Sequence, residues 1–141
     1  MSALRRTASK ARPLPADAVG GLELHVHRPM PGAAVIEVIG EVDLCTAPRL
    51  AEVVESRIRS TVGIVIVDLG KTTFLAVSGL RTLHHLQTLA HDRDVDFYVD
   101  PGDSHPVRRL LERLPLGCER PGIAASLGRT SRLPSPRGIT T

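Results

Sequence analysis

The sequence predicts one α/β domain built on a small mixed sheet, and three observations support this prediction. Segments with the two-residue apolar period of strands alternate with segments whose apolar residues recur at helical spacing. Their order is strand, strand, helix, strand, helix, strand, helix, which is typical of an α/β domain with right-handed crossovers. The chain has 141 residues, which is enough for one domain with its own core.

The first two strands are expected to form a hairpin. Residues 22–26 alternate between apolar and polar side chains, the pattern of a strand with one solvated face. A break rich in proline and glycine at residues 29–32 separates them from an apolar run at residues 34–39. The chain then leaves the sheet, so Asp43 is expected just beyond a strand end.

A helix is predicted after Thr46, because apolar residues recur from Ala47 at i, i+3, i+4, i+7 and i+11. Pro48 falls in the first turn, where its missing N–H costs little. Four consecutive β-branched residues at 64–67 predict a central strand. Asp68 is expected to end that strand and to hold a turn.

Leucines at helical spacing after Gly79 predict a second helix that covers the sheet. Ser78 precedes this glycine where the first turn leaves backbone N–H groups without partners, so it is either a helix cap or a displayed group. Residues 95–99 read as a fourth strand. The pair at 103–104 can cap a last helix, which Pro115 ends.

Asp43 and Ser78 are expected on the same rim of the domain, because the loops at the carboxyl ends of strands gather at one edge of an α/β sheet. The residues alone leave two roles open for Asp43. It is either a solvated acid in a turn or a cap whose side chain bonds to the backbone.

The charge is divided unevenly along the chain. Residues 1–20 carry four basic residues and one acidic residue, and residues 119–141 carry the same numbers. Residues 21–118 carry ten basic and thirteen acidic residues. Both ends are also rich in Pro, Gly, Ser and Thr, so we predict two flexible basic arms around a folded domain at residues 21–118.

Several function classes are not expected. The scarcity of aromatic residues and the lack of a recognition helix argue against direct nucleic-acid binding. No apolar run approaches the ~18 residues of a membrane span, and the N-terminus is not a secretory signal. Cys45 and Cys118 imply no disulfide framework, which favours a reducing cytoplasm.

Catalysis, a metal site and a cofactor are not expected either. Ser78 has no evident histidine partner in the sequence, so a catalytic role is not favoured. The histidines are scattered and the cysteines lack metal-ligand spacing. Glycine-rich phosphate-binding loops are absent from the sequence.

Short motifs follow one another along residues 21–118. They are Gly40-Glu41-Val42-Asp43, Thr46-Ala47 with Leu50, Val65-Ile66-Val67-Asp68-Leu69, Thr73-Phe74-Leu75, Ser78-Gly79-Leu80, and Pro106-Val107 with Leu110 to Leu114. Together they resemble the STAS family, and more specifically its bacterial anti-sigma factor antagonists. The resemblance implies a single small STAS-like domain with a mixed sheet of four to five strands and helices packed mainly on one face.

The resemblance also implies a function. Such antagonists bind an anti-sigma factor that has serine-kinase activity and so free a sigma factor, and ATP enters only through the partner kinase. In the family, the partner phosphorylates a serine immediately before a glycine, which switches the antagonist off, and Ser78 occupies that position. The partner-binding residues implied here are Asp43, Thr46, Ser78, Gly79, Leu80 and Arg81.

The chain departs from the family pattern beside Ser78. The family usually has an aspartate two residues before this serine and often another serine directly before it, whereas this sequence has Ala76 and Val77. Two interpretations therefore stay open. The domain is a binding module switched by phosphorylation, or it is an unswitched STAS scaffold or ligand-sensing module that binds a protein partner without phosphorylation.

Overall fold

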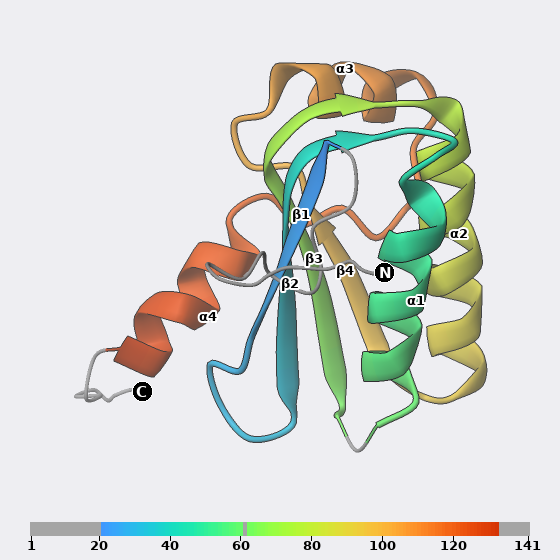
Figure 1. Ribbon diagram of the computed structural model, residues 1–141. Coiled ribbons are helices and arrows are strands. Elements are labelled where there is room, and N and C mark those ends of the chain that lie inside the picture. Colours follow the sequence, from blue (N-terminus) through green and yellow to red (C-terminus); the bar gives the residue numbers. More distant parts are fainter. Residues whose placement is uncertain (1–20, 61, 133–141) are drawn as a thin grey trace, which may run out of the picture.

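The computed structural model describes residues 21–60 and 62–132, with side chains described as far as residue 127. A four-stranded sheet forms its centre (Figure 1). Helices α1 and α2 cover one face of the sheet, α4 lies against the other face, and α3 lies across one end. The α/β class and the mixed sheet predicted from the sequence are confirmed.

The four strands follow one another across the sheet in chain order. They are β1 (Leu22–His27), β2 (Ala33–Val42), β3 (Ile64–Leu75) and β4 (Asp96–Asp100). Strand β1 pairs antiparallel with β2, whereas β2, β3 and β4 are parallel. The predicted hairpin is therefore present, and the parallel strands are joined through helices.

Helices α1 (Ala47–Ile58) and α2 (Val77–Asp92) bury their apolar stripes against the sheet. Leu50 and Val54 of α1, and Leu83 and Leu86 of α2, have no exposed surface. Burying such leucine and valine side chains contributes roughly 1.5–3 kcal/mol each. The core thus lies mainly between these two helices and the sheet, as the helical spacing predicted.

Helix α3 (His105–Arg113) is capped by Ser104, whose Oγ accepts a hydrogen bond from the Val107 N–H at 3.4 Å. The same hydroxyl donates to the carbonyl oxygen of Thr72 at 2.5 Å, so the cap also ties α3 to β3. The sequence therefore located both the cap and the helix correctly.

Strand β3 is longer than the sequence indicated. The prediction that it ends at Asp68 is wrong, because the strand continues to Leu75. Its partner β2 also continues to Val42, and the pairing persists across two register shifts between Glu37 and Glu41. The buried Thr72 hydroxyl donates to the Val38 carbonyl oxygen at 3.1 Å, so polar residues that suggested a turn belong to the sheet.

The folded domain also extends past residue 118, where the sequence predicted the start of a flexible tail. The Val99 N–H donates to the Cys118 carbonyl oxygen at 3.1 Å, and the Arg120 N–H donates to that of Val99 at 2.9 Å. Helix α4 (Ile123–Arg132) then packs Ala124 against Ile66 on the second face of the sheet. Residues 1–20 and 133–141, also predicted to be flexible, lie outside the described residues.

Candidate functional site

The rim where β2 and β3 end brings two predicted site residues close together. The Ala76 N–H, directly before α2, donates to the Val42 carbonyl oxygen at 2.9 Å. A β-carbon placed on Gly79 would lie 2.6 Å from Cγ1 of Val42. The start of α2 is therefore seated against the last residue of β2. Asp43 and Ser78, which adjoin these contacts, share this rim as the sequence predicted.

Ser78 is the second residue of α2 and is partly exposed. Its hydroxyl forms no hydrogen bond with any residue that the structure describes. Ala76 occupies the N-cap position, so no side chain caps the helix, and its first turn holds no acidic residue. Of the two possibilities left open by the sequence, Ser78 is thus the displayed group and not the cap.

Asp43 holds the loop that leads into α1. Its Oδ1 atom accepts hydrogen bonds from the backbone N–H of Thr46 at 3.0 Å and of Cys45 at 2.9 Å. The bond from Thr46 is the main reason that the pKa of Asp43 lies below its ordinary value, and the bond from Cys45 acts in the same direction. Asp43 is therefore a carboxylate at neutral pH, with the backbone-bonding role that the residues alone allowed.

Thr46 is not at the surface. It is 4% exposed, and its hydroxyl accepts from the Asp43 N–H at 2.9 Å and donates to the Glu41 carbonyl oxygen at 2.8 Å. Its hydrogen bonds support the loop and leave nothing to present to a partner. Thr46 was predicted to contact a partner; in this structure it is buried and positions Asp43.

Gly79 and Leu80 are also buried, because the helical period that turns Leu83 into the core turns these two residues toward the sheet. Both were predicted to contact a partner, and in this structure both face the sheet. Arg81 is exposed, as a residue two positions beyond Gly79 should be. Of the six predicted binding residues, only Asp43, Ser78 and Arg81 are accessible in this structure.

Three apolar side chains on the same rim were not predicted as binding residues. Leu44 is 77% exposed, Phe74 is 48% exposed and Val77 is 47% exposed. Leu44 follows Asp43 and Val77 precedes Ser78 in the chain, while Phe74 pairs with Glu41 near the end of β3. We call these three residues the rim patch. Apolar residues in a loop and at a helix start were the signal that could have revealed it.

A model of the STAS domain matches residues 26–122, which is most of the chain. The chain belongs to the STAS domain family. The match begins within β1 and ends directly before α4, so it covers β2, β3, β4, α1, α2 and α3. The resemblance identified from the sequence motifs is thereby confirmed.

Solved structures give the same fold. An anti-sigma factor antagonist from Mycobacterium paratuberculosis has 21% sequence identity and a TM-score of 0.62, over 84% of this STAS domain chain and 98% of that chain. SpoIIAA in its unphosphorylated form has 14% identity and a TM-score of 0.63, over 80% and 100%. The Bacillus cell fate determinant SpoIIAA in its phosphorylated form has 14% identity and a TM-score of 0.60, over 77% and 99%. No curated protein matches the sequence.

Within residues 21–60 and 62–132, no group of three or more His, Cys, Asp or Glu side chains could hold a metal ion. In that part of the STAS domain no helix has both the length and the apolar character needed to cross a bilayer.

Proposed function

We propose that this STAS domain is an anti-sigma factor antagonist. It binds an anti-sigma factor that has serine-kinase activity, which frees a sigma factor, and it loses this binding when the partner phosphorylates Ser78. The observation that carries the proposal is the Ser78 hydroxyl, partly exposed and without a hydrogen-bond partner at the uncapped start of α2. Family membership and the fold shared with solved antagonists support it.

The modification requires only a hydroxyl that another active site can reach. The Ser78 oxygen attacks the γ-phosphorus of ATP held by the partner, a new P–O bond forms, and ADP leaves with the electrons of the broken bond. The hydroxyl proton passes to a base of the kinase. Because Ser78 lies in the first turn of α2, the new phosphate would face backbone N–H groups that no side chain caps.

The phosphate would act on the partner and not on the fold. It adds about −1.5 to −2 charges near neutral pH, and the start of a helix tolerates an anion. A partner that buries the rim patch must also remove water from this phosphate and bring it near the Asp43 carboxylate. Each 1.4 kcal/mol of this cost weakens binding about tenfold, so one phosphate suffices as a release signal.

Val77 makes the surface beside the acceptor apolar. Where the family usually has aspartate and serine before the acceptor, this chain presents Ala76 and an exposed Val77. The rim patch therefore fits a partner with an apolar contact surface, since the buried centre of an interface is more apolar than its rim and is depleted in charged residues. Arg81, exposed on α2, would lie at the polar border of this interface.

The exposed Val77 also favours the second interpretation. An apolar residue next to Ser78 adds to binding whether or not a phosphate is ever attached. In that case the domain is an unswitched STAS scaffold or ligand-sensing module that holds its partner through the rim patch.

Phosphorylation and binding assays separate the two functions. The purified chain is incubated with ATP and its cognate kinase, and the site is located by mass spectrometry, with Ser78→Ala as the matched control. Modification at Ser78, together with at least about tenfold weaker partner binding, supports the antagonist. Stable binding with no phosphate on the chain supports the scaffold and rejects the switch.

A further inference from the structure

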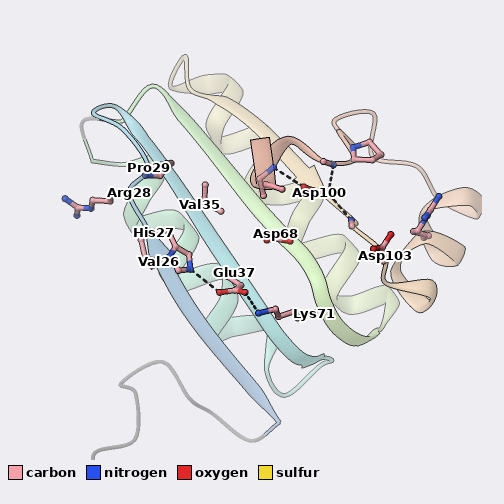
Figure 2. Close-up of a pocket in the computed structure, with 16 residues that line it drawn as sticks. Val26, His27, Arg28, Pro29, Val35, Glu37, Asp68, Lys71, Asp100 and Asp103 are labelled. Carbon is pink, nitrogen blue, oxygen red and sulfur yellow. Dashed lines mark hydrogen bonds and ion pairs between the residues drawn. The ribbon is translucent and has the colours of Figure 1, made fainter. Parts of the chain in front are cut away.

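A cleft opens on the face of the sheet opposite α1 and α2. It has a volume of about 1260 Å³ and lies between the exposed face of β1, β2 and β3 on one side and α4 with the loop after β4 on the other (Figure 2). The wall formed by Ala124 and Ala125 belongs to α4, which begins directly after the last residue matched by the STAS model. The cleft therefore depends on a helix outside the matched family region.

Two of the carboxylates in this cleft have partners for both oxygens. Glu37 binds the His27 Nε2 at 3.0 Å through one oxygen and the Lys71 Nζ at 3.0 Å through the other. Asp100, which is 3% exposed, accepts from the Gly122 and Gly102 N–H groups at Oδ1 and from the Ala124 N–H at Oδ2. Asp100 thus fixes the first turn of α4, and neither acid is available to a ligand.

Asp68 differs from both. Its Oδ1 atom accepts the Gly70 N–H at 2.9 Å, while its Oδ2 atom has no partner among the residues that the structure describes. The side chain lies mid-cleft, between the Glu37–Lys71 pair and Asp100 (Figure 2). Burial, followed by the charges of Asp100 and Glu37, raises the pKa of Asp68 above its ordinary value.

A half-buried carboxylate near two other acids is stabilised by a cation that donates a hydrogen bond to it. Lys71 attracts Asp68 through its charge, but its ammonium group is bound to Glu37 and forms no hydrogen bond with Asp68 in this structure. A bare metal ion does not fit either, since the described residues offer no group of three metal-binding side chains. Val26, Val35 and Pro121 add apolar surface to a cleft that is also lined by Arg28, Arg108 and Asp103, and this apolar surface suits an apolar body.

We propose that this cleft binds a small organic cation, an amine or amidinium on an apolar body, which donates a hydrogen bond to Oδ2 of Asp68. The lining residues do not include Asp43 or Ser78, so this proposal does not rest on the proposed antagonist function. Small-molecule sites combine apolar surface with a few polar groups that fix the orientation of the ligand.

The first test uses a pair of probes that differ in charge. Benzamidine carries an amidinium on an aromatic ring, and benzamide is its neutral analogue of nearly the same shape. In calorimetric and NMR titrations of the full chain, benzamidine should bind at least about tenfold more tightly than benzamide. The largest amide shifts are expected at Gly70 and Gly122. Equal affinities, or shifts confined to other surfaces, would overturn the proposal.

Matched variants locate the charge responsible. Asp68→Asn should remove the preference for benzamidine, whereas Asp103→Asn, at an exposed acid lining the same cleft, should retain it. Equal losses in both variants would indicate a general charge effect and reject the site. If Asp68→Asn did not fold, Ala125→Trp provides a second test, because it fills the cleft from the exposed side of α4 and should abolish binding. Retained binding in Ala125→Trp would also contradict the proposal.

Discussion

Gly79 and Val42 lie so close together that α2 has no room for a side chain at its third residue. A β-carbon on Gly79 would be 2.6 Å from Cγ1 of Val42 and 2.8 Å from Cδ1 of Leu75, both of which are side chains of the buried core. The glycine lets α2 begin directly against the ends of β2 and β3. It therefore determines where Ser78 is presented.

Gly79→Ala should destabilise the domain, although alanine favours helices more than glycine does. Relieving the contacts with Val42 and Leu75 requires a shift of the backbone or of the core, which typically costs about 1–3 kcal/mol. Urea denaturation measures this loss. Gly63→Ala is the control, because a β-carbon there meets only the Gly32 carbonyl oxygen at 3.9 Å. Equal effects of the two substitutions would show that the close approach is not limiting.

Ser78→Asp should change stability and binding in opposite directions. A carboxylate in the first turn of α2 interacts favourably with the helix dipole and should raise the free energy of unfolding by about 0.3–1 kcal/mol. The same charge should weaken partner binding at least about tenfold relative to Ser78→Ala. Thermal unfolding and calorimetry check the two effects separately. A variant that loses stability and binding together would point to damage of the fold and not to a switch.

The rim patch should contribute to binding without contributing to stability. Combining Leu44→Ala with Phe74→Ala should weaken partner binding by about 1–2 kcal/mol or more, the range of central apolar contacts, while the urea midpoint barely moves. Met30→Ala is the matched control, because Met30 is 36% exposed but lies in the hairpin between β1 and β2, at the opposite end of the sheet. An equal loss of affinity in the control would mean that the partner does not dock on this rim.

Asp43 should stabilise the domain in a pH-dependent way. Its hydrogen bonds with the Thr46 and Cys45 amides lower its pKa, so its stabilising effect is present above the ordinary value of 3.8 and is lost as pH falls through the lowered pKa. The difference in unfolding free energy between the native chain and Asp43→Ala should therefore be largest near neutral pH and shrink in acid. A difference that stays constant with pH would contradict this interpretation.

Asp68 should show the opposite dependence. Its raised pKa means that the folded state binds a proton more tightly than the unfolded state, so its ionisation reduces stability as pH rises above the ordinary value of 3.8. Asp68→Asn should accordingly be more stable than the native chain at neutral pH, and the gain should vanish in acid. Denaturant titrations between pH 3 and pH 7 follow both proteins. A less stable Asp68→Asn at neutral pH would refute the prediction.

Periodicity was sufficient to predict the architecture because each apolar stripe faces one core. Leu83 and Leu86 of α2 follow the helical period closely, and the cap at Ser104 follows from local chemistry. The full length of β3 could not be predicted from apolar periodicity. Polar residues such as Thr72 remain in the sheet because β2 pairs with them and Val38 accepts a hydrogen bond, and these are partners distant in the sequence.

The site was predicted in part. The start of α2 and the loop after β2 are local features, so Ser78 and Asp43 could be placed on the same rim from their neighbours in the chain, whereas their proposed roles came from the family resemblance. Burial of Thr46 depends on the carbonyl oxygen of Glu41, and α4 depends on a sheet face provided by Val35 and Ile66. The segment that forms α4 is short and has little apolar periodicity, so the sequence alone does not show that it packs on this face of the sheet.

The hydrogen bonds from Gly122 and Ala124 to Asp100 fix the first turn of α4, and they limit how far the chain can be shortened. Shortening the chain to residues 26–122 would remove Ala124, whose N–H donates to this carboxylate. It would also expose Ile66, against which Ala124 packs. The shortened chain would expose an apolar strip on one face of its sheet and would tend to self-associate. Functional work on the rim is thus best done with residues 123–132 retained, even though they lie on the far side of the molecule.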